Sequence, residues 1–262
     1  MSAILLDGQI VHYEVLGRGR PIIFLHGWVG SWRYWISSMQ VASTSFRAYG
    51  LDLWGFGESA HDSMHYTIDQ QTDLLSRFLD EMGIGKVALV GHGLGALVGF
   101  NFCARWTQSV DRMMGVTSPL YYEAINTRLR TLPLPDLINW IGSKAPEAAT
   151  ALADAPKADP QAIASSISSF QSNDLFGQMR QTQIPCLLVY GQNDPAISIP
   201  TFGSSFNLPH MMHHIVLEGS GHFPMIDETA RFNRLLTDFL ALDSGVSAQE
   251  LQLKDEWKRR VR

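Results

Sequence analysis

Gly91-His92-Gly93-Leu94-Gly95 stands between two apolar segments of different character. The residues before it, 86–90, form a short apolar run that predicts a buried strand. Those after it, 94–105, are apolar and small and predict a buried helix. A strand, a turn with glycines at alternate positions and a helix match the pattern G-x-S-x-G, in which the serine is a nucleophile. Gly93 stands where that serine would be.

The glycine at this position has a clear physical consequence. The centre of such a turn needs backbone angles that cost most residues about 1–3 kcal/mol. Gly93 removes this strain, and it also removes the Oγ that covalent acyl transfer requires. An ordinary glycine turn would also fit the stretch. A phosphate loop fits poorly, since no Lys-Ser/Thr pair follows Gly95. Gly91, Gly93 and Ala96 approximate the dinucleotide-binding pattern G-x-G-x-x-A. This match is weak, because it lies mid-chain and not in a first βαβ unit.

Four further motifs each follow an apolar segment that predicts a strand. In chain order they are His26-Gly27-Trp28 after residues 21–25, Asp52-Leu53-Trp54-Gly55-Phe56-Gly57-Glu58-Ser59 after a strand near 47–51, Gly191-Gln192-Asn193-Asp194 after 186–190, and Gly219-Ser220-Gly221-His222-Phe223-Pro224 after 215–217. Each alone has an ordinary explanation, because Asp194 precedes a proline in a turn and a lone loop histidine is usually solvated. His26, Asp52 and Ser59 are expected to brace their loops.

Together with the glycine turn, these motifs resemble the α/β-hydrolase family, in the family's order and over nearly the whole chain. The resemblance implies an α/β fold with a mostly parallel twisted sheet, flanking helices and a helical cap insertion. It also implies that Asp194 orients His222, the general base, and that the backbone N–H groups of Trp28 and Leu94 form the oxyanion hole. Gly93 occupies the place where the family has Ser, Asp or Cys, so covalent catalysis is in question.

The order of elements supports this organisation. Residues 3–16 predict a hairpin that turns at Asp7-Gly8, and strands and helices then alternate to residue 117, which indicates a parallel sheet. A helix is expected within 66–82 and a strand over 113–116. Residues 118–181 contain prolines and no strong strand, so short helices are expected there, forming the cap. Residues 1–117 and 182–262 form the predicted core domain. A helix follows His222, and a polar helix is expected over 249–258.

Composition excludes several classes of function. The net charge is −5 and the pI about 6.0, and no basic face is evident, so a nucleic-acid partner is not expected. The basic residues 258–262 read as a solvated tail. Cys103 and Cys186 lie in apolar runs and predict reduced core thiols. His213-His214 lacks further ligands for a metal, and adjacent strand residues point to opposite faces. Neither a signal peptide nor a bilayer-spanning run is seen, so no membrane partner and a cytoplasmic location are expected.

Three hypotheses explain an oriented base without a nucleophile. The first is a hydrolase of a small apolar ester, lactone or similar substrate, impaired in covalent catalysis by Gly93. The second is a nucleophile-free enzyme, in which the His-Asp pair activates water or serves a lyase or a cofactor-free oxygenase. The third is a non-catalytic ligand-binding or receptor protein. Trp28, His92 and Phe223 are expected to line the pocket, no cationic cluster is available for a charged ligand, and no cofactor is implied.

Overall fold

One eight-stranded sheet runs through the molecule, with the strand order β1-β2-β4-β3-β5-β6-β7-β8. The computed structural model describes residues 2–201 and 207–253. β1 pairs with β2 and β2 with β4 in antiparallel fashion, and the remaining neighbours are parallel. The predicted α/β class with a mostly parallel sheet is therefore confirmed. The strands are β1 (Ser2–Leu6), β2 (Gln9–Gly17), β3 (Arg20–Leu25), β4 (Phe46–Leu51), β5 (Val87–His92), β6 (Val110–Val116), β7 (Cys186–Gly191) and β8 (Met212–Leu217).

The strands at the centre of the sheet are short apolar runs, as expected where helices cover both faces. Every residue of β5 and of β7 is buried. The first two strands form the predicted hairpin, and Asp7 and Gly8 at its turn have φ values of 51° and 77°. Two successive residues with positive φ match the twist of an antiparallel pair.

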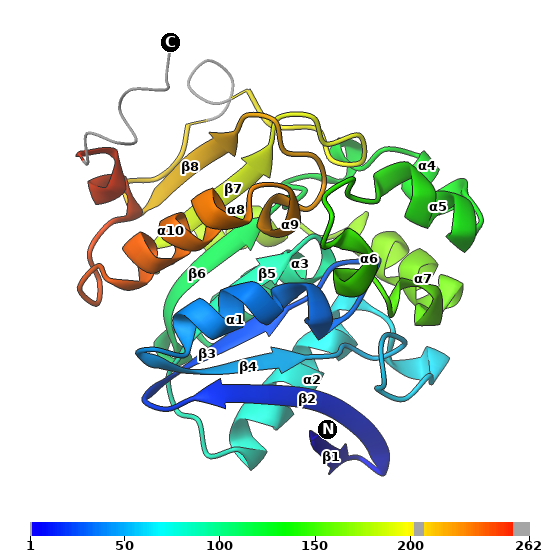
Figure 1. The fold of residues 1–262 in the computed structure, drawn as a ribbon. Coiled ribbons are helices and arrows are strands. Elements are labelled where there is room, and N and C mark those ends of the chain that lie inside the picture. Colours follow the sequence, from blue (N-terminus) through cyan, green and yellow to red (C-terminus); the bar gives the residue numbers. More distant parts are fainter. Residues whose placement is uncertain (1, 202–206, 254–262) are drawn as a thin grey trace.

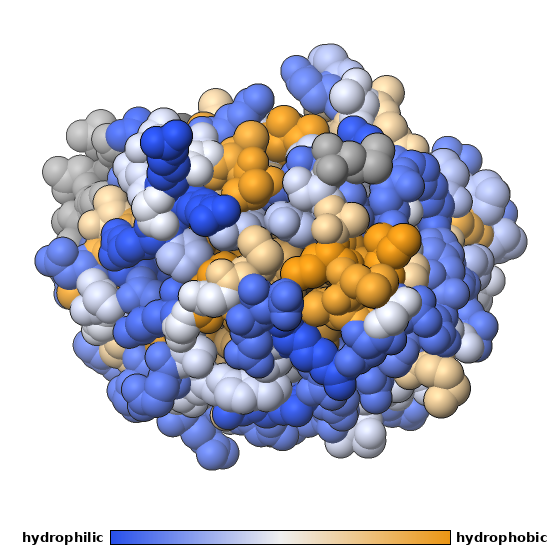
Figure 2. Space-filling model, turned by 90° about the horizontal axis from the view of Figure 1, so that it is seen from below, coloured by the Kyte–Doolittle hydropathy of each residue, from blue (hydrophilic) through white to orange (hydrophobic). Residues whose placement is uncertain are grey.

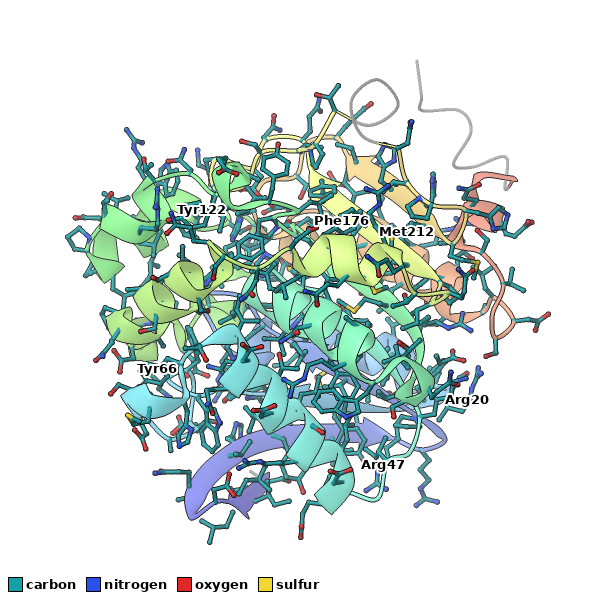
Figure 3. The ribbon with its side chains drawn as sticks, turned by 180° about the vertical axis from the view of Figure 1, so that it is seen from behind. Arg20, Arg47, Tyr66, Tyr122, Phe176 and Met212 are labelled. Carbon is teal, nitrogen blue, oxygen red and sulfur yellow. The ribbon has the colours of Figure 1, made fainter. Side chains whose placement is uncertain are left out.

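Helices cover both faces of this sheet (Figure 1). α1 (Ile36–Ala42) and α10 (Thr229–Leu240) pack together on one face. α2 (Ile68–Glu81), α3 (Leu94–Arg105) and α8 (Leu175–Arg180) lie on the other, where Figure 3 shows them in front of the strands. α3 is buried from Leu94 to Cys103, because it lies between its neighbouring helices and the sheet. Its ends coincide with those expected from the sequence.

Between β6 and β7 the chain forms short helices, in keeping with the prolines of residues 118–181. They are α4 (Arg128–Thr131), α5 (Leu134–Ile141), α6 (Ala148–Ala151), α7 (Pro160–Phe170) and α8. α7 begins at Pro160, and the Asp159 side chain caps it by accepting a hydrogen bond from Gln161 N at 2.8 Å. α5, α6 and α7 gather at one end of the molecule (Figure 1). By contrast, α8 packs against α3, and the Phe100 and Phe176 rings lie 5.8 Å apart.

Asp52 braces the loop that follows β4, as the sequence predicts. Its buried carboxylate accepts hydrogen bonds from Trp32 N at 2.9 Å and Glu58 N at 3.1 Å, and it pairs with His12 Nδ1 at 2.8 Å. The Ser59 hydroxyl donates to the Asp52 carbonyl oxygen at 2.7 Å. One side chain thus ties together β2, the loop after β3 and the loop after β4.

Near the C-terminus, where the sequence predicts a polar helix over 249–258, the described residues form a 3₁₀ helix, η6 (Ala248–Leu253). Residues 254–262, and with them the expected basic tail at 258–262, lie outside the described residues. Cys103 and Cys186 are buried free thiols, as predicted. In the described part of the chain, no helix is long and apolar enough to cross a bilayer.

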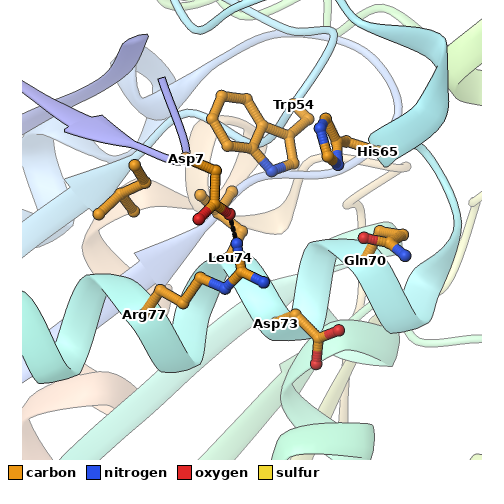
Figure 4. A pocket seen from close by; sticks show the side chains of 8 residues that line it. Asp7, Trp54, His65, Gln70, Asp73, Leu74 and Arg77 are labelled. Atoms are coloured by element: carbon orange, nitrogen blue, oxygen red, sulfur yellow. Dashed lines mark ion pairs between the residues drawn. The ribbon is translucent and has the colours of Figure 1, made fainter. Parts of the chain in front are cut away.

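Two surface features lie near the N-terminal hairpin. Leu5 and Ile10 face each other in register across β1 and β2 and are 65% and 54% exposed. Figure 2 looks onto the side of the molecule that carries this hairpin and shows apolar side chains gathered within a largely hydrophilic face. A cavity of about 10 Å³ beside Trp54 and His65 has room for one water molecule at most (Figure 4). Neither feature adjoins the predicted site residues.

Candidate active site

The turn between β5 and α3, where the sequence predicts a nucleophile elbow, is tight and begins α3 at Leu94. Gly93 precedes α3 with φ 50° and ψ −109°, a conformation that favours glycine. Its N–H donates to Val116 O at 3.0 Å, and its carbonyl accepts from Ala96 N at 3.1 Å. A Cβ on Gly91 would lie 2.3 Å from Gly95 O, so the backbone itself passes too closely for a side chain there. The glycine spacing is thus a requirement of this tight turn.

The loop after β3 runs alongside the elbow. Leu53 N donates to His26 Nε2 at 2.9 Å, which leaves His26 Nδ1–H to donate to Gly27 O at 2.8 Å. Gly95 N donates to His26 O at 3.0 Å and joins this loop to α3. His26 therefore braces the loop, as expected. Neither Trp28 N–H nor Leu94 N–H donates a hydrogen bond within the described part of the chain, so both predicted oxyanion donors remain available.

Asp194 and His222 meet at the carboxyl ends of β7 and β8. His222 Nδ1 lies 3.0 and 3.1 Å from the two Asp194 carboxylate oxygens, and both side chains are almost fully buried. Asp194 also accepts from Ala196 N at 2.8 Å, so the carboxylate both orders its turn and orients the imidazole. With Nδ1–H donating to the carboxylate, Nε2 carries a lone pair. Within the described residues, this buried Nε2 has no hydrogen-bond partner.

Asp227 holds the loop that carries His222 through a hydrogen bond to its backbone. Gly221 N donates to Asp227 Oδ2 at 2.8 Å, and the Ser143 hydroxyl donates to Asp227 Oδ1 at 2.5 Å. Asp227 belongs to α9 (Pro224–Asp227), which follows the histidine directly, while Ser143 comes from the 118–181 segment. One carboxylate therefore connects this segment to the histidine loop.

His92 connects the elbow to both neighbouring loops. Its Nε2 lies 2.9 Å from His222 O, and its Nδ1 lies 2.9 Å from the Tyr34 hydroxyl, which also contacts Gly27 N. Burial lowers the pKa of His92 well below its usual value, and the neighbouring His222 lowers it further. Burial raises the pKa of Tyr34 well above its usual value, so this hydroxyl keeps its proton. No sequence pattern singled out Tyr34, because its role depends on contacts with distant residues.

Trp28 and Phe223, both expected at the pocket, are fully buried. The Trp28 indole covers the elbow, because a Cβ at position 93 would lie 3.2 Å from its Cε3 and Cζ3 atoms. Trp28 Nε1 donates to Ser166 Oγ in α7 at 3.0 Å. The Phe223 ring packs 5.0 Å from that of His222 and 5.6 Å from that of Tyr34. Tyr34 also borders a cavity of about 470 Å³ between α1, α6 and α9.

Three further tryptophans make their own packing contacts elsewhere in the structure. Trp54 stacks with His65 near α2, and Trp35 packs in the core against Phe232. Arg128 lies over the Trp140 ring in the 118–181 segment. In the described part of the chain, no group of three His, Cys, Asp or Glu side chains could hold a metal ion.

A sequence model of the Alpha/beta hydrolase family matches residues 22–235. Since this match spans well over half of the sequence, the chain belongs to the α/β hydrolase family. The family resemblance inferred from the five motifs is confirmed.

Individual relatives are distant. The 2-hydroxy-6-oxo-6-(2'-aminophenyl)hexa-2,4-dienoic acid hydrolase of Metapseudomonas resinovorans is 22% identical over an alignment that covers 92% of this chain and 90% of that protein. A soluble epoxide hydrolase of Corynebacterium sp. (strain C12) is 28% identical over 109 residues, which cover 42% of this chain and only 38% of that protein.

Solved structures share the fold. A serine-to-glycine mutant of the N-acyl homoserine lactonase AidH, complexed with N-hexanoyl homoserine lactone, matches with a TM-score of 0.80 at 20% identity, over 91% of this chain and 96% of that chain. An enol-lactonase from Burkholderia xenovorans LB400 matches with a TM-score of 0.76 at 19% identity, over 92% and 100%. At these identities the likeness establishes the fold alone.

Proposed function

We propose that this chain hydrolyses small, largely apolar esters or lactones, and that the His222–Asp194 pair activates the attacking water directly. The observation that carries the proposal is His222 Nε2, a buried, unpartnered base on an imidazole that Asp194 orients from the other side. Gly93 offers no hydroxyl, so the acyl-enzyme route of a serine nucleophile is closed to the chain as it stands.

The proposed reaction needs one base and one pair of N–H donors. His222 Nε2 takes a proton from water while the water oxygen attacks the carbonyl carbon of the substrate. The carbonyl oxygen becomes negatively charged and accepts hydrogen bonds from Trp28 N and Leu94 N. When the tetrahedral intermediate collapses, the C–O bond of the leaving group breaks, and the proton on His222 Nε2 passes to the departing alkoxide. The products are the carboxylic acid and the alcohol, or the hydroxy acid from a lactone.

The substrate class is inferred from the surroundings of the base. Trp28 and Phe223 are apolar, and none of the described ion pairs places an Arg or Lys beside Asp194 or His222. A neutral substrate therefore suits the site better than a phosphate or a polyacid. The fold is shared with a lactonase and an enol-lactonase, which supports this choice of class without fixing the substrate.

We also propose that residues 118–181 act as a cap, with 1–117 and 182–262 as the core domain. Two buried polar contacts and one partly buried contact support the cap. Ser166 accepts from Trp28 Nε1, and Asp154 accepts from the Ser31 hydroxyl at 2.9 Å, both buried, whereas the hydrogen bond from Ser143 to Asp227 is partly buried. Because the Trp28 indole covers Gly93, a substrate reaches the elbow only when that indole moves, and its bond to Ser166 links this movement to the cap.

A paired assay tests the function. The protein and its His222→Ala variant are compared on a panel of short-chain aryl esters and lactones. His65→Ala is the control, since His65 is partly exposed and packs against Trp54. Turnover that His222→Ala abolishes and His65→Ala preserves is expected, and intact-mass spectrometry should find no acylated protein. Equal turnover in His222→Ala contradicts the proposal. A ligand that stabilises the protein and is recovered unchanged would instead indicate a binding protein.

A further inference from the structure

A chain of buried hydrogen bonds runs behind the His222–Asp194 pair. Gly27 N contacts the Tyr34 hydroxyl, which lies 2.9 Å from His92 Nδ1, and His92 Nε2 lies 2.9 Å from His222 O. The four residues belong to four different segments: the loop after β3, the 3₁₀ helix η1 (Trp32–Trp35), the end of β5 and the loop before α9. The chain therefore connects an oxyanion loop to the base.

The direction of every hydrogen bond in this series is fixed by its two terminal groups, the Gly27 N–H and the His222 carbonyl oxygen. A backbone N–H can only donate, so the Tyr34 oxygen accepts from Gly27 and its own hydrogen goes to His92 Nδ1. His92 then carries its single proton on Nε2, which donates to the His222 carbonyl oxygen, a group that can only accept. One tautomer of His92 satisfies all of these groups. A phenylalanine at position 34 would leave Gly27 N–H and His92 Nδ1 without this partner.

The His222 carbonyl has a second, weaker donor in Thr117. The Thr117 hydroxyl lies 3.4 Å from His222 O, and Thr117 N donates to Val189 O at 2.7 Å. Thr117 is buried and has a φ of 49°, which is an outlier for a β-branched residue. Such a conformation persists only where its surroundings enforce it, and it is typical of functional sites. The main chain of His222 is thus held by side chains from the ends of both β5 and β6.

We propose that Tyr34 and His92 are positioning residues for the base: they fix the main chain of His222, and with it the direction of Nε2, relative to the oxyanion loop at Gly27. The proposal rests on the function proposed above, in which this base activates water. Neither residue needs to touch the substrate. Their effect passes through the His222 carbonyl and the Gly27 amide.

Packing alone offers a competing explanation, and the variants separate the two. The Tyr34 ring lies 5.5 Å from the His92 ring and 5.6 Å from that of Phe223, so its bulk supports the site in any case. Tyr34→Phe keeps this bulk and removes only the hydroxyl. Tyr49→Phe is the matched control, because Tyr49 is equally buried but its hydroxyl has no hydrogen bond in the described part of the chain.

His92 offers a second pair of variants. His92→Phe keeps a ring and removes both polar atoms, whereas His92→Gln retains an N–H donor that can reach the His222 carbonyl. A misplacement of the base by about 1 Å costs about 100-fold in rate. We expect Tyr34→Phe and His92→Phe to lower kcat by about that factor with little change in KM, and His92→Gln to recover much of the loss.

Nitrogen-15 NMR of histidine-labelled protein tests the geometry without relying on turnover. The expected spectrum shows His92 protonated on Nε2 alone and unchanged from about pH 5 to pH 8, the range in which an ordinary histidine titrates. Tyr34→Phe should shift the His92 Nδ1 resonance and the carbonyl carbon resonance of His222, while Tyr49→Phe shifts neither.

The outcomes separate this inference from the proposed function. If the parent protein turns over no ester or lactone but the spectra behave as expected, the function fails and the hydrogen-bond chain stands. If the parent is active and Tyr34→Phe matches it in kcat and in the His222 carbonyl resonance, the positioning role is overturned. A spectrum that shows the proton on His92 Nδ1 overturns the proposed series of hydrogen bonds from Gly27 to His222.

Discussion

Replacing Gly93 by serine would add a hydroxyl at the predicted elbow, near His222, the proposed base, whose imidazole contacts Asp194. We expect Gly93→Ser to open a covalent route, with an initial burst of leaving group and an acylated protein visible by mass spectrometry. In a serine protease, loss of the triad lowers kcat by about 10⁶-fold and leaves a residual 10³–10⁴-fold advantage over water. We therefore expect the kcat of Gly93→Ser on aryl esters to exceed that of the parent by at least about 100-fold.

The same substitution has a cost that can be worked out from the backbone. A side chain at φ 50° is strained by about 1–3 kcal/mol. Its Cβ would lie 3.2 Å from two Trp28 ring atoms, so the indole must yield by a few tenths of an ångström against its bond to Ser166. At roughly 2–4 °C per kcal/mol for a domain of this size, the melting temperature should fall by about 2–12 °C.

Gly93→Ala is the control that makes this experiment decisive. Alanine brings the same Cβ and the same backbone strain but no hydroxyl, so both variants should show a similar drop in melting temperature. The parent and both variants are assayed for ester turnover, burst amplitude and acyl adduct. The serine variant could fold as well as the alanine variant and yet hydrolyse esters no faster than the parent. In that case His222 and the predicted oxyanion donors do not support catalysis, and the assignment of this site is refuted.

Three further predictions follow from single contacts. Asp194→Asn should lower turnover by about 10⁴-fold, the scale seen when the orienting acid of a serine protease is lost, and a change below tenfold in steady-state assays would count against its role. Ser166→Ala should loosen the Trp28 indole and cost about 1 kcal/mol of stability, visible as stronger acrylamide quenching of tryptophan fluorescence; unchanged quenching would contradict the link. Burial lowers the pKa of His12, but the hydrogen bond to Asp52 and its charge outweigh this, and the net pKa is raised. The free energy of unfolding gained from this raised pKa is complete below the unfolded pKa near 6.5 and is lost as pH rises through the folded pKa. In urea titrations over this pH range, His12→Gln should therefore show a flatter fall in stability than the parent. An equally steep fall would disprove the pairing of His12 with Asp52.

Local signals explain why much of the fold could be predicted. The helix over 94–105 and the strand–turn–helix around Gly93 depend on neighbouring residues, and their predicted ends agree with the structure. The polar helix predicted over 249–258 is described only as far as residue 253, where it is a 3₁₀ helix, and such a short polar segment gains little stability from helix propensity alone. Its described part is held by tertiary contacts instead: Leu251 is buried, and the Gln249 side chain donates to Met212 O at 3.3 Å.

The candidate site divides in the same way. The pairing of Asp194 with His222 was implied by the family resemblance, and in the structure the two side chains lie within hydrogen-bond distance. Tyr34 and Ser166 could not be predicted. The Tyr34 hydroxyl acts on His92, 58 positions away, and Ser166 acts on Trp28 across 138 positions. Side-chain pairings over such separations leave no periodicity in the sequence, and they are set only when the core has packed.

The strand order also bears on how the chain acquires its structure during synthesis. β2 pairs with β1 and with β4, whereas β3 lies on the far side of β4. When the ribosome has released only residues up to the end of β3, the hairpin and β3 have no common neighbour, and an isolated two-stranded hairpin is marginally stable in water. Only the arrival of Phe46–Leu51 joins them, and at that moment Asp52 meets His12. The hairpin of β1 and β2 is therefore made before β4 and must wait for that strand to hold it in place.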